Sequence, residues 1–362
     1  MKKDGFSVIK TLIICALVAV LAIISLVIVY FSSIKGTNGK EDVTVSIVEG
    51  DTYSSIVNKL YTSGLIKNKT TYKVYLKLNK PETLQQGTYL LNPKYSVKEI
   101  IEFMENGEHI IKETKNVTFV EGKNMRYVIN KITEEFAIKE DDILSVLSDS
   151  DYLDSIIDKY WFLTEDIKNK DIYYSLEGYL YPDTYEFYTD SSIKDIFKTM
   201  LDNMDKKLKP YKEEIEKSKH SIHEMITLSS IIELEAGKAD DRKGVAGVFY
   251  NRLEDGWSLG SDVTTYYASK IDLADRDLKQ SELSNCNAYN TRATCMAGKL
   301  PVGPICNASV GSLVAAIEPT SHNYYYFVAD KNGKTYFNKN SSGHTSTVSK
   351  LKKDGLWYEY ED

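Results

Sequence analysis

An uncharged apolar run near the N-terminus constrains the fold of this chain more than any other feature. Thr11 to Phe31 is a run of 21 residues without a charged side chain, and nearly all of them are apolar. A helix needs about 20 such residues to cross the hydrocarbon core of a membrane. Three lysines precede the run, whereas Glu41 and Asp42 dilute the positive charge that follows it. The positive-inside rule therefore predicts a single-pass protein of the cell membrane, with a cytoplasmic tail at 1–10 and the rest of the chain outside.

A cleaved signal peptide is the alternative interpretation of this run, because signal peptides also place an apolar segment after a basic one. The run is longer than the apolar part of a typical signal peptide, and no small-residue cleavage site follows it. We therefore predict a retained membrane helix at 11–31 and a short polar linker at 32–42.

Composition and charge exclude several classes of function. The chain has 362 residues, of which 42% are hydrophobic and 27% charged, as in globular proteins with room for two domains. A net charge of −7 argues against nucleic acid as the main partner. No His, Cys and Asp cluster has metal-ligand spacing, and no phosphate-binding or dinucleotide-binding loop occurs, so we expect neither a metal nor a cofactor.

An internal repeat follows the linker. Residues 45–60 and 117–132 each read as a strand, a Val-Glu-Gly turn and an amphipathic helix. Two copies suggest related strand–helix units rather than a long array of repeats. In the first copy, Gly50, Asp51 and Thr52 follow the strand, which resembles the opening of a LysM module, a β-α-α-β unit that binds glycans.

The residues after this opening are compatible with the same module. We predict its second helix at 69–79 and its closing strand at 87–91, and Ser96 and Glu99 form a capping box for a further helix. The sequence therefore predicts a LysM-like α+β subdomain at 43–108. The alternative is a small α+β packing unit that binds no ligand.

Further along the chain, a carboxylate lies on the apolar stripe of a predicted helix at 222–236. At about 100° of rotation per residue, Glu233 falls about 20° from the first residue of the helix, in the middle of that stripe. Glu235 falls about 220° away, among polar residues, so only Glu233 is predicted to face inward. An apolar setting lets a carboxyl group hold a proton near neutral pH, as a general acid must. The alternative is a structural ion pair with an arginine such as Arg242 or Arg252.

Polar and aromatic clusters follow this helix. Residues 261–264 come after a glycine turn, residues 289–291 lie in a loop, and Pro301 and Pro304 predict a rigid turn before a helix at 309–317. The predicted elements of this half of the chain are helices at 193–216, 222–236 and 242–253 and a hairpin with strands at 324–328 and 335–337. The architecture is therefore α+β. A single acid in a polar, aromatic setting fits cleavage of a glycosidic bond.

Three cysteines follow the membrane helix, in a compartment that permits disulfides. Cys286 and Cys295 flank a short loop, and we predict a disulfide between them. Cys306 is then left over as a free thiol.

Taken together and in order, these motifs resemble the endolytic murein transglycosylase family, also called MltG or YceG-like. The segments that carry the resemblance are 177–184, 229–233, 245–253, 261–264, 288–291, 300–304, 326–330 and 337–344. The family also has a LysM-like unit between the membrane and the catalytic domain. The resemblance therefore implies a YceG-like α+β catalytic domain at 109–362.

The activity that the resemblance implies is cleavage of the MurNAc–GlcNAc bond within peptidoglycan glycan strands, which leaves 1,6-anhydroMurNAc ends and terminates nascent strands. Glu233 matches the family's catalytic glutamate, which would donate a proton to the bridging oxygen and then accept one from the MurNAc C6 hydroxyl. We expect Asp262, Thr264, Tyr289 and Asn290 to bind or position the sugar. The resemblance also implies peptidoglycan synthases as partners.

The chain departs from the family's pattern at two positions. The family usually has Gln before the residue matching Ser261 and Pro between the Asp and the Thr, whereas this chain has Gly260 and Val263. Two other functions stay open. One is a muramidase-type hydrolase, in which water attacks the sugar, and the other is a non-catalytic peptidoglycan-binding protein that works through the LysM-like unit.

Overall fold

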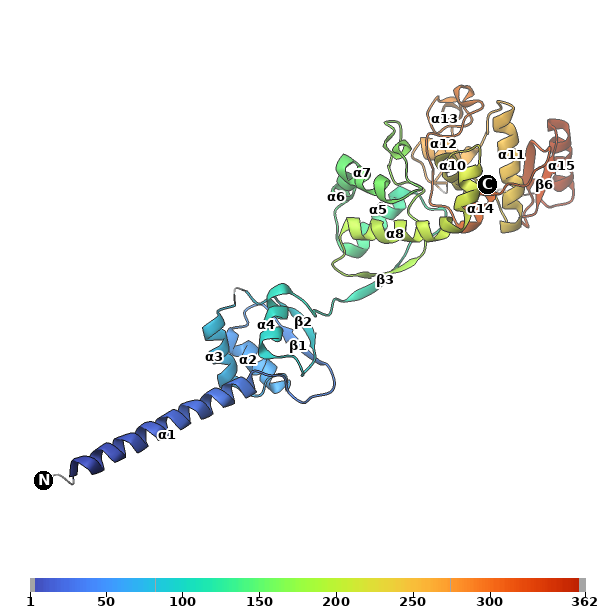
Figure 1. Cartoon of the computed structure of the whole chain (residues 1–362). Coiled ribbons are helices and arrows are strands. Elements are labelled where there is room, and N and C mark those ends of the chain that lie inside the picture. The colour runs from blue at the N-terminus through green and yellow to red at the C-terminus, as the bar shows by residue number, and fades with distance from the viewer. Residues whose placement is uncertain (1–3, 82, 274, 358–362) are drawn as a thin grey trace. The chain divides into compact units, whose positions relative to one another are not determined.

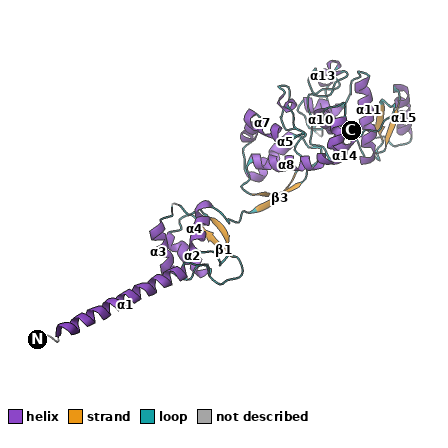
Figure 2. Ribbon diagram, viewed as in Figure 1, coloured by secondary structure: helices purple, strands orange, loops and turns teal. Residues whose placement is uncertain are grey.

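The computed structural model describes residues 4–81, 83–273 and 275–357. The chain folds into two compact units, Met1–Glu113 and Thr114–Asp362 (Figure 1). Within the described ranges the strands form three two-stranded antiparallel sheets, and helices make up most of the remaining regular structure (Figure 2). The predicted mixed α+β fold is therefore confirmed.

The first element is a long apolar helix, α1 (Asp4–Ser33). Its stretch Ile9–Ser33 has a mean hydropathy of 3.4 and is long and apolar enough to cross a membrane. The apolar side chains of this stretch are exposed around the helix, and Leu26, for example, is 68% exposed. The predicted N-terminal apolar helix is confirmed, and its direction across a membrane stays a prediction.

The rest of the first unit has the order β-α-α-β and then a further helix. Its elements are β1 (Val43–Ile47), α2 (Tyr53–Thr62), α3 (Lys69–Asn79), β2 (Gly87–Leu91) and α4 (Val97–Asn106). β1 and β2 pair antiparallel, with Val43 opposite Leu91. Leu60, Tyr72 and Ile100 are fully buried between the sheet and the three helices. The helix and the strand predicted at 69–79 and 87–91 are α3 and β2.

The segment that connects α1 to β1 lies along the first unit. Ile34 packs against the core of this unit, and its carbonyl oxygen accepts a hydrogen bond from the backbone N–H of Val97 at 2.9 Å. Three residues later, the N–H of Thr37 donates to the carbonyl oxygen of Pro93 at 2.6 Å. The end of α1 is therefore attached to this unit by packing and by backbone hydrogen bonds.

The second unit begins with helices around a two-stranded ribbon. Its first elements are β3 (Thr114–Thr118), α5 (Met125–Phe136), α6 (Glu140–Leu147), α7 (Ser150–Lys159), β4 (Thr184–Tyr188), α8 (Ile193–Leu208) and α9 (Lys212–Lys217). The helix predicted at 193–216 is thus two helices, joined by a 3-10 turn at Lys209–Tyr211. Pro210 lies in that turn, and a proline cannot donate the backbone hydrogen bond that a continuous helix needs.

The centre of the second unit is α10 (Ile222–Glu235), which begins with a capping box formed by Ser221 and Glu224. α10 packs against α11 (Arg242–Glu254), α12 (Asp262–Ala268) and α14 (Val310–Ile317). The remaining elements are α13 (Gln280–Ser284), β5 (Tyr326–Ala329), β6 (Thr335–Asn338) and α15 (Ser341–Lys353). α10 therefore ends among helices that come from three other parts of the sequence.

The predicted hairpin is present, with a later start than expected. β5 and β6 pair antiparallel, with Phe327 opposite Phe337. The tight turn between them places Gly333 at φ 76°, a left-handed conformation that favours glycine. The first strand begins at Tyr326 rather than at 324, and the carbonyl oxygen of Tyr324 accepts a hydrogen bond from the Asn251 side chain at 2.9 Å.

Candidate active site

Two glutamates at the end of α10 lie in different surroundings, and the first of them, Glu233, is held by an arginine and a serine. Its Oε1 lies 3.3 Å from Nη2 of Arg242. Its Oε2 accepts hydrogen bonds from the backbone N–H of Ser309 at 3.0 Å and from the Ser309 hydroxyl at 2.6 Å. The Glu233 side chain is 8% exposed. These contacts join α10 to the first turns of α11 and α14, and the role of Glu233 as the acid stays a prediction.

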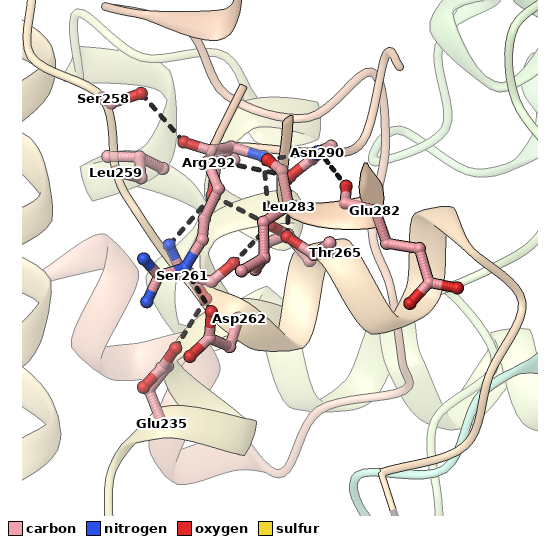
Figure 3. A network of polar contacts seen from close by, with 12 residues as sticks. Glu235, Ser258, Leu259, Ser261, Asp262, Thr265, Glu282, Leu283, Asn290 and Arg292 are labelled. Atoms are coloured by element: carbon pink, nitrogen blue, oxygen red, sulfur yellow. Dashed lines mark hydrogen bonds and ion pairs between the residues drawn. The ribbon is translucent and has the colours of Figure 1, made fainter. Parts of the chain in front are cut away.

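The second glutamate, Glu235, is the last residue of α10 and is half-buried. Its Oε1 accepts a hydrogen bond from the Ser261 hydroxyl at 2.6 Å. Burial raises the pKa of Glu235 above its usual value, and the negative charge of Asp262 adds to this rise, while the Ser261 hydrogen bond and two arginines oppose it. Figure 3 shows the carboxyl group of Glu235 next to Ser261 and Asp262. A carboxyl group with a raised pKa that is still partly exposed suits a general acid.

The prediction that only Glu233 faces inward is wrong, because α10 is buried on nearly all sides. His223 and Thr227, which were expected to share the outer face with Glu235, are 7% and 1% exposed. His223 is accommodated by hydrogen-bonding contacts with the Tyr179 hydroxyl at 2.7 Å and the Val302 carbonyl oxygen at 2.9 Å. Glu224 in the first turn stays exposed, but most of the helix is covered on all sides, so rotation angles do not separate the two glutamates at its end.

Asp262 lies at the first turn of α12 and pairs with Arg292 (Figure 3). The side chain of Asp262 is 51% exposed, which leaves part of its carboxylate open to solvent. The structure brings Asp262 close enough to Glu235 for their charges to interact. The role of Asp262 toward a sugar stays a prediction.

The other three predicted site residues form a buried scaffold beside this pair. Thr264 donates to the carbonyl oxygen of Ser261 at 2.7 Å. The Asn290 amide nitrogen donates to three backbone carbonyl oxygens, and its oxygen accepts from Thr265 at 2.6 Å. The Tyr289 hydroxyl accepts from a backbone N–H at 3.2 Å. Because Thr264, Tyr289 and Asn290 are at most 1% exposed, their contacts here are those of a scaffold, and direct sugar contact stays a prediction.

A disulfide closes the loop that carries this scaffold. Cys286 and Cys295 are bonded, with their Cα atoms 6.1 Å apart, as predicted. The loop between them contains Tyr289, Asn290 and Arg292, so the bond restrains the backbone from which Arg292 reaches Asp262. Cys306 is a free thiol and is buried.

A cavity of about 310 Å³ lies at the end of α10, and Gly122 on its wall lies against Glu233, because a Cβ there would be 3.7 Å from Glu233 Cγ. Leu234, which precedes Glu235, and Val263, which follows Asp262, line it together with Arg126 and Tyr266. Arg126 Nη2 pairs with an aspartate at 2.6 Å, whereas its buried Nη1 has no hydrogen-bond partner among the described residues. The cavity therefore offers a free donor and an aromatic wall, and its volume is within the range of small-ligand sites.

The sequence analysis did not single out a third buried carboxyl group, Glu177. Its Oε2 accepts hydrogen bonds from the Met125 backbone N–H at 2.8 Å and from the Tyr267 hydroxyl at 3.0 Å. Its Oε1 has no partner within the described part of the chain. Burial raises the pKa of Glu177 to about 7. The available signal was its position in the aromatic segment 177–184, where it precedes the buried Tyr179 and Tyr181.

No cluster of three or more His, Cys, Asp or Glu side chains within residues 4–81, 83–273 and 275–357 is arranged to hold a metal ion. The polar groups around Glu235 are a serine, an aspartate and two arginines. Such groups supply protons, charge and hydrogen bonds, which is the chemistry of acid–base catalysis.

Comparison with known proteins gives consistent matches over most of the chain. Residues 45–350 match the YceG-like family. A protein named endolytic murein transglycosylase from Bacillus subtilis (strain 168) is 32% identical over 315 residues, which cover 86% of each chain. A protein of the same name from Streptococcus pneumoniae serotype 2 is 30% identical over 86% of this chain, which spans 59% of that longer relative. The crystal structure of a YceG-like protein from Listeria monocytogenes, 34% identical, aligns with a TM-score of 0.59 and covers 85% of this chain and 100% of that chain.

Proposed function

The chain belongs to the YceG-like family, and from this premise we propose that it is an endolytic murein transglycosylase that cuts peptidoglycan glycan strands. The relatives that carry this name match 86% of the chain at 30–32% identity. We further propose that residues 43–108 form a LysM-like subdomain and that residues 109–362 form the catalytic domain. The β-α-α-β order of the first unit supports the LysM-like assignment.

We propose Glu235 as the acid in competition with Glu233, the residue that matches the family's catalytic glutamate. The observation that carries this assignment is the contrast between their partners. Glu233 accepts three hydrogen bonds from Arg242 and Ser309, whereas Glu235 accepts one from a neutral serine and has a raised pKa. A group that must release and regain a proton needs a free oxygen and a pKa near the working pH. The prediction of Glu233 as the acid is tested by the same experiment.

The reaction needs one carboxyl group that acts twice. Protonated Glu235 donates to the bridging oxygen as the bond from MurNAc C1 to that oxygen breaks, and GlcNAc leaves with its hydroxyl restored. The resulting carboxylate accepts the proton of the MurNAc C6 hydroxyl, whose oxygen forms the new bond to C1. The product is a 1,6-anhydro ring, and Glu235 returns to its protonated form. We propose that the sugar lies in the cavity lined by Leu234 and Val263, at the end of α10 that carries both glutamates.

A hydrolase is the second candidate, because Asp262 lies close to Glu235. Glycosidases that use water or a covalent intermediate need a second carboxylate, and Asp262 is half exposed beside the proposed acid. In that reaction water would attack C1 and leave a reducing MurNAc end. The two products differ by one water, about 18 Da, because the anhydro ring forms without it.

The test is digestion of purified glycan strands by the full chain in detergent, with the products read by mass spectrometry. We expect anhydro ends from the wild-type chain and from Glu213→Gln, an exposed control, and none from Glu235→Gln. Reducing ends would establish the hydrolase. Loss of cleavage in Glu233→Gln but not in Glu235→Gln would return the acid to Glu233. Cleavage that survives both changes would indicate another acid, and a folded wild-type chain that binds glycan without cutting it would indicate a binding protein.

Localisation and partners follow from the apolar helix and the family. We propose that α1 spans the cell membrane with the N-terminus in the cytoplasm and the second unit outside. Protease added to intact cells should then remove the second unit, and resistance in intact but not in opened cells would contradict this orientation. We also propose peptidoglycan synthases as partners in the termination of nascent strands. Crosslinking in cells followed by mass spectrometry would test that partnership.

A further inference from the structure

One helix of the first unit presents a face that is basic and apolar at once. The segment 67–81, which contains α3, has five lysines and no acidic residue. The exposed residues of this face, from here on called the basic face, are Lys73, Val74, Lys77, Leu78 and Lys80. Leu78 is 71% exposed and Val74 is 42% exposed. Among the described residues, none of the three lysines is paired with a carboxylate.

The buried side of α3 shows that this exposure is not a packing defect. Thr71, Tyr72 and Leu76 are buried in the core of the first unit on the opposite side of the helix. The buried side of α3 therefore holds the helix in place, and the basic face remains exposed to solvent. A helix with an apolar anchor, lysines and exposed aliphatic residues has the composition of a membrane-surface element.

The second observation is where this helix lies relative to the end of α1. Nζ of Lys67, two residues before α3, donates to the carbonyl oxygen of Ser32 at 3.2 Å. Tyr75 on α3 lies within electrostatic range of Tyr30, in the last turn of α1. Figure 1 shows α3 beside the end of α1. α3 is thus next to the point where the apolar helix leaves the hydrocarbon layer.

A groove on this side of the unit adds a place for a headgroup. It has a volume of about 410 Å³, and Lys73, Lys77 and Lys80 line it together with Tyr53 and Leu76. Three ammonium groups around an apolar floor match the phosphate and the acyl region of an anionic phospholipid. Lysines near a charged membrane surface are attracted by about 1 kcal/mol each.

We propose that the basic face of α3 docks on anionic phospholipid headgroups at the membrane surface from which α1 emerges. The first unit then rests on the bilayer through two contacts, the apolar helix and the basic face. This attachment fixes the orientation of the first unit against the membrane. This attachment involves none of the residues of the candidate active site, so it can be tested independently of the proposed transglycosylase activity.

The experiment places an environment-sensitive fluorophore at position 78 of the full chain. Leu78→Cys in a Cys15→Ser background has a single accessible thiol, because Cys306 is buried and the other two cysteines are bonded to each other. The labelled protein is reconstituted in nanodiscs of phosphatidylglycerol or of phosphatidylcholine, with and without a spin-labelled quencher lipid. We expect blue-shifted, quenched emission in the phosphatidylglycerol discs, and loss of both effects in high salt.

The matched variants separate the basic face from general charge. K73E/K77E/K80E should lower the ratio of docked to undocked protein about 100-fold or more, because three lysines contribute about fivefold each. K170E/K217E/K339E changes three exposed lysines of the second unit by the same charge and should leave the probe unchanged.

Equal probe signals in the two kinds of disc, or an unchanged signal in K73E/K77E/K80E, would overturn the proposal. A third outcome would assign the groove to sugar instead. In that case the signal would ignore lipid charge, would respond to added soluble glycan fragments, and would lose that response in K73E/K77E/K80E.

Discussion

The two glutamates that close α10 are two residues apart, and they differ in almost every physical respect. Glu233 is nearly buried, faces a guanidinium and accepts two hydrogen bonds from Ser309. Glu235 accepts one hydrogen bond from Ser261, lies near Asp262 and has a pKa that burial raises. The first arrangement joins three helices, and the second leaves a carboxyl group free to exchange a proton. The proposal that Glu235 is the acid rests on this difference in partners.

The largest expected effect is on activity, and it should fall on Glu235. Glu235→Gln removes the exchangeable proton while keeping the size of the side chain, so cleavage of glycan strands should fall about a thousandfold. The initial rate of release of strand ends measures it, with Glu213→Gln as the exposed control. The unfolding temperature should stay within a few degrees of the wild type. An active Glu235→Gln variant would remove the contrast between the two glutamates.

The second effect is on stability, and it should fall on Glu233. Glu233→Ala leaves the largely buried guanidinium of Arg242 without its carboxylate, which should lower the free energy of unfolding by about 3 kcal/mol. Urea unfolding of the full chain in detergent measures this change. Glu235→Ala breaks one hydrogen bond to a serine, so it should lower the free energy of unfolding by clearly less than Glu233→Ala does. Equal losses of stability in the two variants would contradict the assignment of separate roles.

The third effect is on the stability and activity that depend on the disulfide loop, which among the described residues contacts the surroundings of Glu235 and not those of Glu233. Reduction of the Cys286–Cys295 disulfide, or its replacement by two serines, should lower the free energy of unfolding by about 2–3 kcal/mol, as expected for a loop of this length. Because this loop carries Arg292, activity should also fall, while the ion pair of Glu233 on the other side of α10 is untouched. Unfolding in the presence and absence of reductant gives the first quantity, and the cleavage rate of the reduced protein gives the second. Full activity after reduction would show that Arg292 does not depend on the loop.

The smallest effect extends the comparison to Glu177, which has neither an arginine partner nor an exposed oxygen. Its pKa is raised by burial to about 7, above the ordinary value of 4.5, so the folded state binds this proton more tightly than the unfolded state. The stabilisation is complete below pH 4.5 and is lost as the pH rises through 7. Between pH 6 and pH 8 the free energy of unfolding should fall by about 1 kcal/mol. Glu177→Gln should remove this slope, and an unchanged slope would place its origin elsewhere.

Local features of the fold were predictable where neighbouring residues decide them. α3 and β2 have the bounds that the sequence indicated, and the capping box of Ser96 and Glu99 begins α4 as expected. The helix predicted at 193–216, by contrast, is interrupted by a 3-10 turn that contains Pro210. The hairpin of β5 and β6 starts late, beside a hydrogen bond to Asn251, which lies far away in the sequence.

The site was predictable as a set of segments and not as a set of contacts. The segments at 233–235, 261–264 and 289–292 do come together, because α10, α12 and the disulfide loop pack side by side. The orientation of the two glutamates was not predictable from rotation angles. His223 can be buried because its ring nitrogens have hydrogen-bonding partners in Tyr179 and Val302. Such distant partners cannot be predicted from the periodicity of the sequence.

The attachment of Ile34 and Thr37 to the first unit has a mechanical consequence. A flexible linker would let the first unit rotate independently of α1. The packed Ile34 side chain and the two backbone hydrogen bonds instead couple the rotation of this unit to that of α1. A thinner or thicker bilayer changes the tilt of a spanning helix, and a change in the tilt of α1 should then rotate the first unit with it. The proposed membrane anchoring therefore predicts that the orientation of the first unit follows the tilt of α1.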